Sequence, residues 1–390
     1  MISRLPIIAP AATGGDIVSA LLAGGPRQNP FARQLISSIG MAHVYLTGSG
    51  SAAFYCCLSM LAKTSFRKEM VLPAYTAGSL VTVARQAGLT PVLCDISPED
   101  FNLDIAKLPG SLSARTLAVV PVHMFGIGVK DIGTLKEATR GIYLVEDCCQ
   151  AMGSIAGARP VGKTGDISLF SFNRGKNFPL SGGGCCGTNN ELLAKELGKE
   201  TVRLSRRGGK DSLAAAARAL AFYIGTRQLL YGLANGLAAR FRETTPPKSI
   251  PLEAMTDFDA GLGSRLLQSA EALFSLRYSN GMFLLNGLKG IPGIRLPRFD
   301  AKDRPVFNRF PVVFEDLGRL SRVEKELWKQ GIESSRMYAK PLHHMFDLGY
   351  KPEEFPEACF FAQHLLTLPV HPQCSQKQLE RMMEVIKRWA

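Results

Sequence analysis

Short apolar runs alternate with amphipathic stretches between residues 40 and 190. The short runs are rich in β-branched and other apolar residues, as in buried strands. The stretches between them repeat apolar residues at helical spacing. This order is typical of α/β proteins in which helices cover a mostly parallel sheet. The predicted strands are 43–47, 70–75, 90–96, 116–123, 142–147, 167–172 and 184–188, and the predicted helices include 51–63, 76–87, 131–140 and 190–204.

The alternation stops after residue 203. A basic segment that contains glycine is followed by a long apolar helical stretch at 213–241. Its longest run without a charged residue, from Gln228 to Ala239, has 12 residues. A bilayer span needs roughly 20 apolar residues, so this stretch is not predicted to cross a membrane. Two interpretations stay open, helices packed in a core or subunit interface and a helix lying on an anionic membrane surface.

The segment "ETTPPKSIP" has the composition of a linker. We therefore predict a large domain of residues 1–250, with a helical insertion at about 205–245. Residues 251–390 are predicted to form a smaller α+β domain, with a helical stretch at 257–289 and a final helix at 375–389.

The composition indicates a globular protein with a basic surface and free cysteines. With 390 residues, 46% of them apolar, the chain can bury a large core. Its net charge of +13 favours anionic partners, but we find no nucleic-acid-reading motif and expect no nucleic acid partner. The nine cysteines include three adjacent pairs and no CxxC spacing, so no metal site is predicted. Their odd number and the absence of a recognisable secretory leader favour free thiols in the cytoplasm.

Two ionisable residues follow predicted strands, where ligands of open α/β sheets bind. Asp147 ends a buried strand, and a carboxylate there needs a cationic or hydrogen-bonded partner. The protonated ring nitrogen of pyridoxal phosphate (PLP) would be such a partner, although capping of the next helix would also explain an aspartate. Lys176 lies between a predicted strand end and three glycines. A lysine in a dehydrated pocket can form a Schiff base, whereas a lone lysine is usually a surface charge.

Gly50 and Ser51 lie at the start of a predicted helix within "LTGSGSAAF". The free N–H groups of a helix N-terminus, together with its dipole, can bind a phosphate group. The GxxxxGK[ST] pattern of a P-loop is absent, so this signal is weak by itself.

Taken in order along the chain, these segments resemble one known family. "LTGSGSAAF", "VEDCCQAMG", "GDISLFSFNRGKNFPLSGGG" and "GIESSRMYAKPLHHMF" are similar to segments of the DegT/StrS-type sugar-nucleotide aminotransferases. Those proteins are fold type I PLP-dependent enzymes, and the resemblance covers nearly the whole chain. It implies a large domain with a mostly parallel seven-stranded sheet sandwiched by helices, followed by a smaller C-terminal domain.

The resemblance also implies roles for individual residues. Lys176 would form the Schiff base with PLP and carry protons, and Asp147 would keep the pyridine nitrogen protonated. The other cofactor-binding residues implied are Gly50, Ser51 and Ser171 at the phosphate, Gln150 near the phenolic oxygen, and Tyr75 as a stacking ring. Arg336, Tyr338 and His343 match a segment that approaches the substrate in relatives. For His123, at the end of a strand, a packed structural role is equally open.

The family's activity is the transfer of an amino group from an amino acid, expected to be glutamate, to a nucleotide-linked keto-sugar. Such enzymes serve surface polysaccharide or aminosugar biosynthesis. We therefore expect a cytoplasmic homodimer, with peripheral membrane association left open by the basic surface. Arginine and lysine suit a substrate that carries a diphosphate.

Two other functions are compatible with the same scaffold. One is a PLP-dependent sugar dehydratase, in which histidine replaces the Schiff-base lysine, so that Lys176 argues against it. The other is a non-catalytic scaffold or regulatory protein at a membrane surface. It is suggested by Ala77 in place of an aromatic residue, by the missing Asn-Tyr-Arg segment that reaches across the dimer in relatives, and by residues 203–245.

Overall fold

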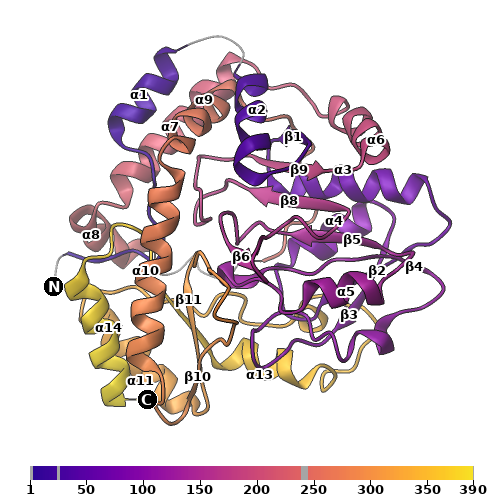
Figure 1. Cartoon of the computed structure of the whole chain (residues 1–390). Helices are drawn as coiled ribbons and strands as arrows, with labels where there is room; N and C mark the ends of the chain where they lie inside the picture. Colours follow the sequence, from indigo (N-terminus) through magenta and orange to yellow (C-terminus); the bar gives the residue numbers. More distant parts are fainter. Residues whose placement is uncertain (1–2, 24–26, 239–244, 390) are drawn as a thin grey trace.

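Seven strands form one sheet at the centre of the molecule (Figure 1). The computed structural model describes residues 3–23, 27–238 and 245–389 and, within 234–238, the backbone alone. The strand order is β1-β9-β8-β5-β4-β2-β3, and β9 alone runs antiparallel to its neighbours. The predicted mostly parallel sheet is thereby confirmed. The strands are β1 His43–Thr47, β2 Glu69–Pro73, β3 Thr90–Cys94, β4 Thr116–Val119, β5 Tyr143–Asp147, β8 Ile167–Ser171 and β9 Gly184–Thr188.

Helices cover both faces of this sheet. On one face α3 packs across β8 and β9 and lies against α4 and α6. On the other, α9 packs against α1, α2 and α7. The bounds are α1 Gly14–Leu22, α2 Gln28–Ile39, α3 Gly50–Lys63, α4 Ser79–Gln86, α5 Ile132–Ala138, α6 Glu191–Val202, α7 Gly209–Gly225, α8 Gln228–Ala238 and α9 Asp257–Leu267.

The adjacent cysteines of β9 show how the two faces are separated. Cys185 packs in the core beneath α2 and α9, whereas Cys186 packs in the core beneath α3. Successive side chains of a strand point to opposite faces, so these two thiols cannot bind one ion. All nine cysteines are free, and seven of them are buried. Of the six thiols in the three adjacent pairs, five are buried in the core, and Cys149 is partly exposed.

The C-terminal part of the chain contains a second, smaller sheet. Its three antiparallel strands are ordered β10-β11-β12, and α14 packs against α10 and α11 beside them. Helix α10 runs the length of this side of the molecule (Figure 1). The elements are α10 Ala270–Leu288, β10 Ile294–Arg295, β11 Phe310–Phe314, α11 Leu317–Lys329, α12 Leu342–Met345, α13 Pro356–His364, β12 Leu365–Leu368 and α14 Gln376–Trp389.

Shorter elements complete the fold. They are the 3₁₀ turns Leu108–Ser111 and Met124–Gly126 and the two-stranded ribbon of β6 Ile155–Ala156 and β7 Arg159–Pro160. None of the helices within the described residues has both the length and the apolar character needed to span a bilayer. The domain division at residue 250 stays a prediction.

Several elements are shorter than their sequence pattern suggested, and three of these differences lie near the cavity at the carboxyl edge of the large sheet. β2 ends at Pro73, β4 ends at Val119, and α4 begins only at Ser79. Pro121 cannot donate a ladder hydrogen bond, which explains why the ordered pairing of β4 stops before it. The loop after β2 leads to Thr76 and Ala77 of the cavity described below, whereas Val120 and Val122 after β4 are buried in the core.

The glycine run after Lys176 lies directly under the first turn of α3. Gly183 has a φ of 103° and donates its N–H to the Gly48 carbonyl over 2.9 Å. A Cβ on Gly184 would lie 2.6 Å from the Ser49 carbonyl carbon and 2.8 Å from Gly50 Cα. Only glycine permits this approach of two backbones.

We predict that Gly184→Ala destabilises the protein by about 1–3 kcal/mol, because the new methyl group meets backbone atoms that cannot turn away. Urea denaturation measures the difference. Gly133→Ala, in α5, is the matched control, because a Cβ there has no described neighbour within 4 Å beyond its own helix. It should be neutral or stabilise the fold by up to about 1 kcal/mol. Equal unfolding free energies for the two variants would contradict the proposed close packing.

Candidate active site

A cavity of about 180 Å³ opens at the carboxyl edge of the large sheet. Seven of the ten residues singled out from the sequence line it, although they come from distant parts of the chain. These seven are Gly50, Ser51, Asp147, Gln150, Ser171, Lys176 and Tyr338. Its other lining residues are Ser49, Phe54, Thr76, Ala77, Ser79, Leu80, Val83, Cys149, Leu169 and Asn173. The fold therefore brings the two candidate reactive groups, Asp147 and Lys176, into one site.

The first turn of α3 forms one end of the cavity. Ser49 caps the helix, and its side chain accepts the N–H of Ala52 over 3.0 Å. A Cβ on Gly50 would lie 2.8 Å from the Cβ of Ser171, which ends β8. The first N–H groups of a helix have no partner within that helix. With the Ser51 and Ser171 hydroxyls, they make a cradle suited to a phosphate group.

Asp147 and Gln150 line the cavity from β5 and the turn that follows it. The Asp147 carboxylate is buried, and its Oδ1 accepts the N–H of Cys149 over 2.9 Å. The side-chain oxygen of Gln150 accepts from the N–H of Phe125 at 3.2 Å and from the side chain of Asn308 at 3.1 Å. The local turn bond thus holds Asp147, and two donors hold Gln150.

Thr76 and Tyr338 add polar groups at the mouth. Within the described part of the chain, the buried Thr76 hydroxyl has no hydrogen-bond partner. An unpaired buried hydroxyl is costly and indicates a ligand or water. Burial raises the pKa of Tyr338 to about 12, despite the opposing effect of Arg309. The phenol therefore stays protonated at neutral pH and can donate a hydrogen bond.

Lys176 is half-buried and follows a tight turn. Its N–H bonds the carbonyl of Asn173 over 3.2 Å, and its own carbonyl accepts from the guanidinium of Arg277 over 3.3 Å. Arg277 is buried in α10 and also donates to the carbonyls of Phe307 and Asn308. Burial lowers the pKa of Arg277 to about 10, so the group stays charged at neutral pH. We infer that Arg277 positions the lysine, a role that sequence reasoning missed.

The remaining three singled-out residues do not line the cavity. The buried Tyr75 ring packs 4.7 Å from Phe361 between ring centroids, and its hydroxyl donates to the Met337 carbonyl. Thr76 and Ala77, from the same loop, line the cavity instead. Arg336 pairs with Glu324 at 2.9 Å, and His343 lies in a separate cluster. Their roles at cofactor or substrate stay predictions.

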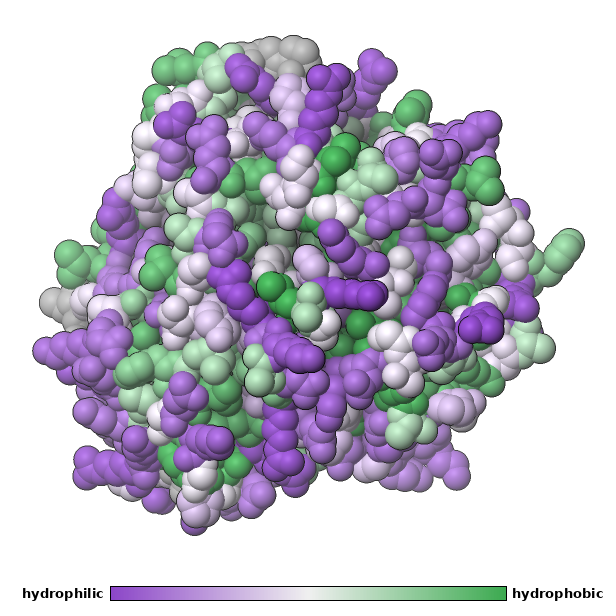
Figure 2. All heavy atoms as spheres, viewed as in Figure 1, coloured by the Kyte–Doolittle hydropathy of each residue, from purple (hydrophilic) through white to green (hydrophobic). Residues whose placement is uncertain are grey.

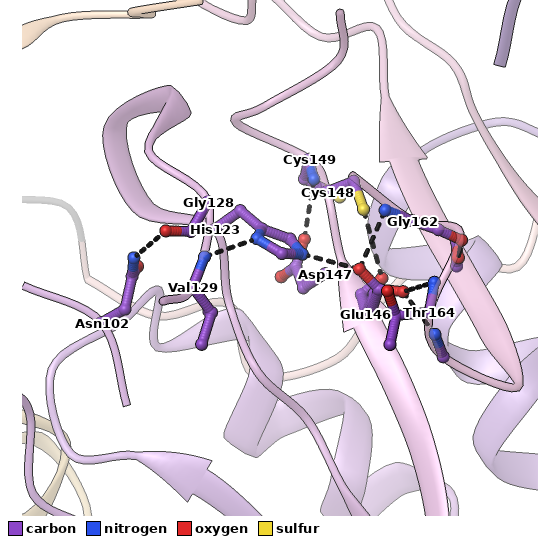
Figure 3. Close-up of polar contacts among 12 residues, drawn as sticks. Asn102, His123, Gly128, Val129, Glu146, Asp147, Cys148, Cys149, Gly162 and Thr164 are labelled. Atoms are coloured by element: carbon purple, nitrogen blue, oxygen red, sulfur yellow. Dashed lines mark hydrogen bonds and ion pairs between the residues drawn. The ribbon is translucent and has the colours of Figure 1, made fainter. Parts of the chain in front are cut away.

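A buried network lies behind Asp147 (Figure 3). His123 contacts Glu146 through Nε2 at 3.0 Å, while its Nδ1 accepts the N–H of Val129 at 3.0 Å. This pattern requires the proton on Nε2, so the ring donates to the carboxylate. Glu146 also accepts the backbone N–H groups of Gly162 at 2.8 Å and Thr164 at 2.7 Å. His123 therefore has a packed, hydrogen-bonded position in the wall behind the cavity.

The same contacts determine the acidity of Glu146. Burial by itself would raise its pKa, but the His123 bond and the backbone N–H groups of Gly165 and Gly162 outweigh burial and lower it. The two neighbouring carboxylates at the end of β5 therefore lie in different surroundings. Glu146 is satisfied inside the protein, whereas Asp147 faces the cavity.

A family model described as the DegT/DnrJ/EryC1/StrS aminotransferase family matches residues 17–387. The chain belongs to this family. The resemblance read from the sequence motifs is confirmed.

Two relatives and one solved structure illustrate the similarity. The chain is 27% identical, over 94% of its length and 88% of the relative's, to dTDP-3-amino-3,4,6-trideoxy-alpha-D-glucose transaminase of Streptomyces venezuelae. It is 26% identical, over 90% and 85%, to UDP-N-acetyl-3-dehydro-alpha-D-glucosamine 3-aminotransferase of Acidithiobacillus ferrooxidans. Spr1654 of Streptococcus pneumoniae, solved in its PLP form, superposes with a TM-score of 0.80 at 23% identity, covering 99% of this chain and 98% of that one. This likeness shows the fold.

We predict that Glu146→Gln destabilises the fold by roughly 1.5–3 kcal/mol at neutral pH, because several donors lose a charged acceptor. The wild-type contribution is fully present above the unfolded pKa of about 4.3, and it is lost as pH falls through the lower folded pKa. Urea denaturation from about pH 5 downward, through the unfolded pKa of about 4.3, should therefore show a weaker pH dependence in the variant. Parallel pH profiles for both proteins would contradict this role of Glu146.

Proposed function

We propose that this protein is a PLP-dependent aminotransferase that moves an amino group from an amino acid, with glutamate the expected donor, to a nucleotide-linked keto-sugar. The observation that carries the proposal is the single cavity shared by Lys176, Asp147 and the first turn of α3. Membership of an aminotransferase family supports it, as do the relatives named for dTDP- and UDP-linked sugars.

The residues of the cavity fit PLP. The first turn of α3, with Ser51 and Ser171, suits the phosphate group, and Asp147 at the far wall suits the ring nitrogen. The unpartnered Thr76 hydroxyl leaves a polar group free for a ligand. The PLP form of Spr1654 supports the same cofactor.

Bound PLP supplies an electron sink that stabilises the carbanion formed at the amino carbon. Residues of this chain would carry out the proton transfers. Lys176 would take a proton from the amino carbon and return one on the other side of the transfer. Asp147 would hold a proton on the ring nitrogen. The apolar side chains of Phe54, Leu80 and Val83 line the same cavity and limit the access of water.

Cys149 also lies in this cavity, so its protonation state decides whether the thiol could compete with Lys176 as the nucleophile. Burial raises its pKa well above the usual value, and the Asp147 charge raises it further against the opposing effect of Lys176. The thiol therefore stays protonated and is a weak nucleophile. Lys176 is left as the nucleophile that can form a bond to an aldehyde.

The two other functions named from the sequence receive less support. A dehydratase would be expected to have histidine at position 176, where this chain has lysine. A non-catalytic scaffold would not need an unpartnered hydroxyl, a reactive amine and a carboxylate in one cavity. We also propose a cytoplasmic location, which suits nine free cysteines.

We predict that Lys176→Ala gives no measurable turnover and no absorbance change on addition of glutamate, because the variant lacks the amine that binds the cofactor aldehyde. Wild-type protein loaded with PLP should lose its visible absorbance with glutamate and regain it with an acceptor keto-sugar. Lys302→Ala, an exposed lysine away from the cavity, is the control. Turnover by Lys176→Ala would reject the assignment, and a colourless wild-type protein that cannot be loaded would favour the scaffold.

We further propose a homodimer formed through an apolar surface on α1, α7 and α8. Figure 2 shows apolar residues on the side where Figure 1 draws α1 and α8. Clusters of exposed apolar side chains mark interaction sites. The exposed apolar residues of this surface are Val18, Leu21, Leu22, Leu213, Leu220, Ile224, Leu229, Leu230 and Leu233.

We predict that the double substitution Leu220→Glu and Ile224→Glu converts a dimer into a monomer, because two charges would be buried at the interface. Light scattering coupled to size exclusion measures the mass. Leu192→Glu, at a more exposed leucine on α6, should leave the dimer intact. If the wild type is monomeric but floats with anionic liposomes, and the double variant does not float, the surface binds membranes instead.

A further inference from the structure

One cluster of potential metal ligands lies outside the cavity. His343 and His344 are in α12, and Cys359 is in α13, with Sγ 3.6 Å from Nε2 of His343 and 3.9 Å from Nε2 of His344. The three ligand atoms all lie within 4.8 Å of one another. His344 is exposed and Cys359 is half-buried, so the cluster is open to solvent.

The carbonyl oxygen of Pro352 faces the same point. It lies 3.3 Å from Nε2 of His343, 2.8 Å from Nε2 of His344 and 3.6 Å from Sγ of Cys359. Tetrahedral zinc sites have bonds of about 2.0–2.1 Å to nitrogen and 2.3 Å to sulfur, which place the ligand atoms about 3.3–3.6 Å apart. Four donor atoms thus have nearly the mutual spacing of a tetrahedral coordination shell.

Hydrogen bonds account for only part of this arrangement. The single S–H of Cys359 can donate to the Glu354 carbonyl at 3.4 Å, but its sulfur also lies near both imidazoles and the Pro352 carbonyl. If both Nε2 atoms carry protons for Pro352, they cannot accept from the thiol. Nδ1 of His343 is buried without a partner among the described residues, so this ring makes its polar contacts through the Nε2 that faces the cluster.

Two carboxylates lie near the cluster, although one of them, Asp95, is paired with Lys107 at 2.8 Å. The carboxylates of Asp95 and Glu354 lie close enough to His343 to act on it electrostatically. Asp95 is buried at the start of α13, where it accepts the N–H of Ala358 over 2.9 Å. Imidazole and thiolate are the ligands that zinc prefers in proteins.

We propose that His343, His344 and Cys359 bind one Zn²⁺ ion, with the Pro352 carbonyl or a water as the fourth ligand. Binding would release the Cys359 proton, because the thiolate is the metal ligand. The ion would tie α12 to α13 and to the connection between them.

The position of α12 gives this ion a structural consequence. The N–H of Leu342 bonds the carbonyl of Ala74 over 2.8 Å, two residues before Thr76 of the cavity. The side chain of Met345 lies close to Gly78, just before α4, where an added Cβ would come within 3.0 Å of it. Tyr338, which lines the cavity, lies just before α12 in the chain. A zinc ion here would fix the segment that forms one side of the cavity mouth.

The test is Zn²⁺ and Co²⁺ titration of the purified full chain after chelator treatment, in phosphate-free buffer. We expect one Zn²⁺ per chain by calorimetry, and for Co²⁺ the thiolate charge-transfer band and visible bands of a tetrahedral site. Cys359→Ser should remove the charge-transfer band. Cys359→Ser and His344→Ala should each weaken Zn²⁺ binding by more than the roughly 10–100-fold that loss of an outer-shell partner costs.

Two control variants keep all three ligands. Cys374→Ser removes a thiol that lies 3.8 Å from a single histidine, His371, and His364→Ala removes another histidine of α13. Both controls should bind Zn²⁺ as the wild type does, and circular dichroism verifies that all four variants fold. Absence of Zn²⁺ binding, equal affinity in Cys359→Ser, or a Co²⁺ spectrum without the charge-transfer band would each overturn the proposal.

Discussion

The close approach of two backbones, one at Gly184 and one at the first turn of α3, is the constraint on which the site depends. It places the end of β8 beside the helix N-terminus, so that Ser171 and Gly50 touch. It also fixes the course of the chain between Lys176 and β9. The proposed phosphate cradle and the candidate amine of Lys176 thus both depend on one glycine-dependent contact rather than on two independent features.

The sheet could be predicted from the sequence because its central strands are buried on both faces and are therefore apolar runs of distinctive length. The same reasoning singled out Asp147 and Lys176, since the carboxyl ends of parallel strands meet at one edge, and both residues line one cavity. It overextended β2 and β4, because the residues after Pro73 and Val119 are apolar for another reason. They line the loops at the cavity mouth or pack beneath it.

Residues whose role depends on contacts between distant segments could not be predicted in this way. Arg277 lies in an apolar helical stretch, and only the fold shows that its guanidinium reaches the carbonyl of Lys176. His343 and Cys359 are 16 residues apart in the chain. Their proximity arises because α13 folds back beside α12. Nothing in the spacing of those residues resembles a common zinc motif.

The hydrogen bond from Arg277 to the Lys176 carbonyl also links this lysine to a long helix. Helix α10, which holds Arg277, packs at one side against α14 beside the small sheet and contacts α9 near the large one. The backbone of Lys176 is therefore hydrogen-bonded to a helix, α10, that packs near both sheets. One guanidinium thus links the backbone that carries the Lys176 side chain to the helix that runs beside the small sheet, so the position of this lysine depends on how α10 packs.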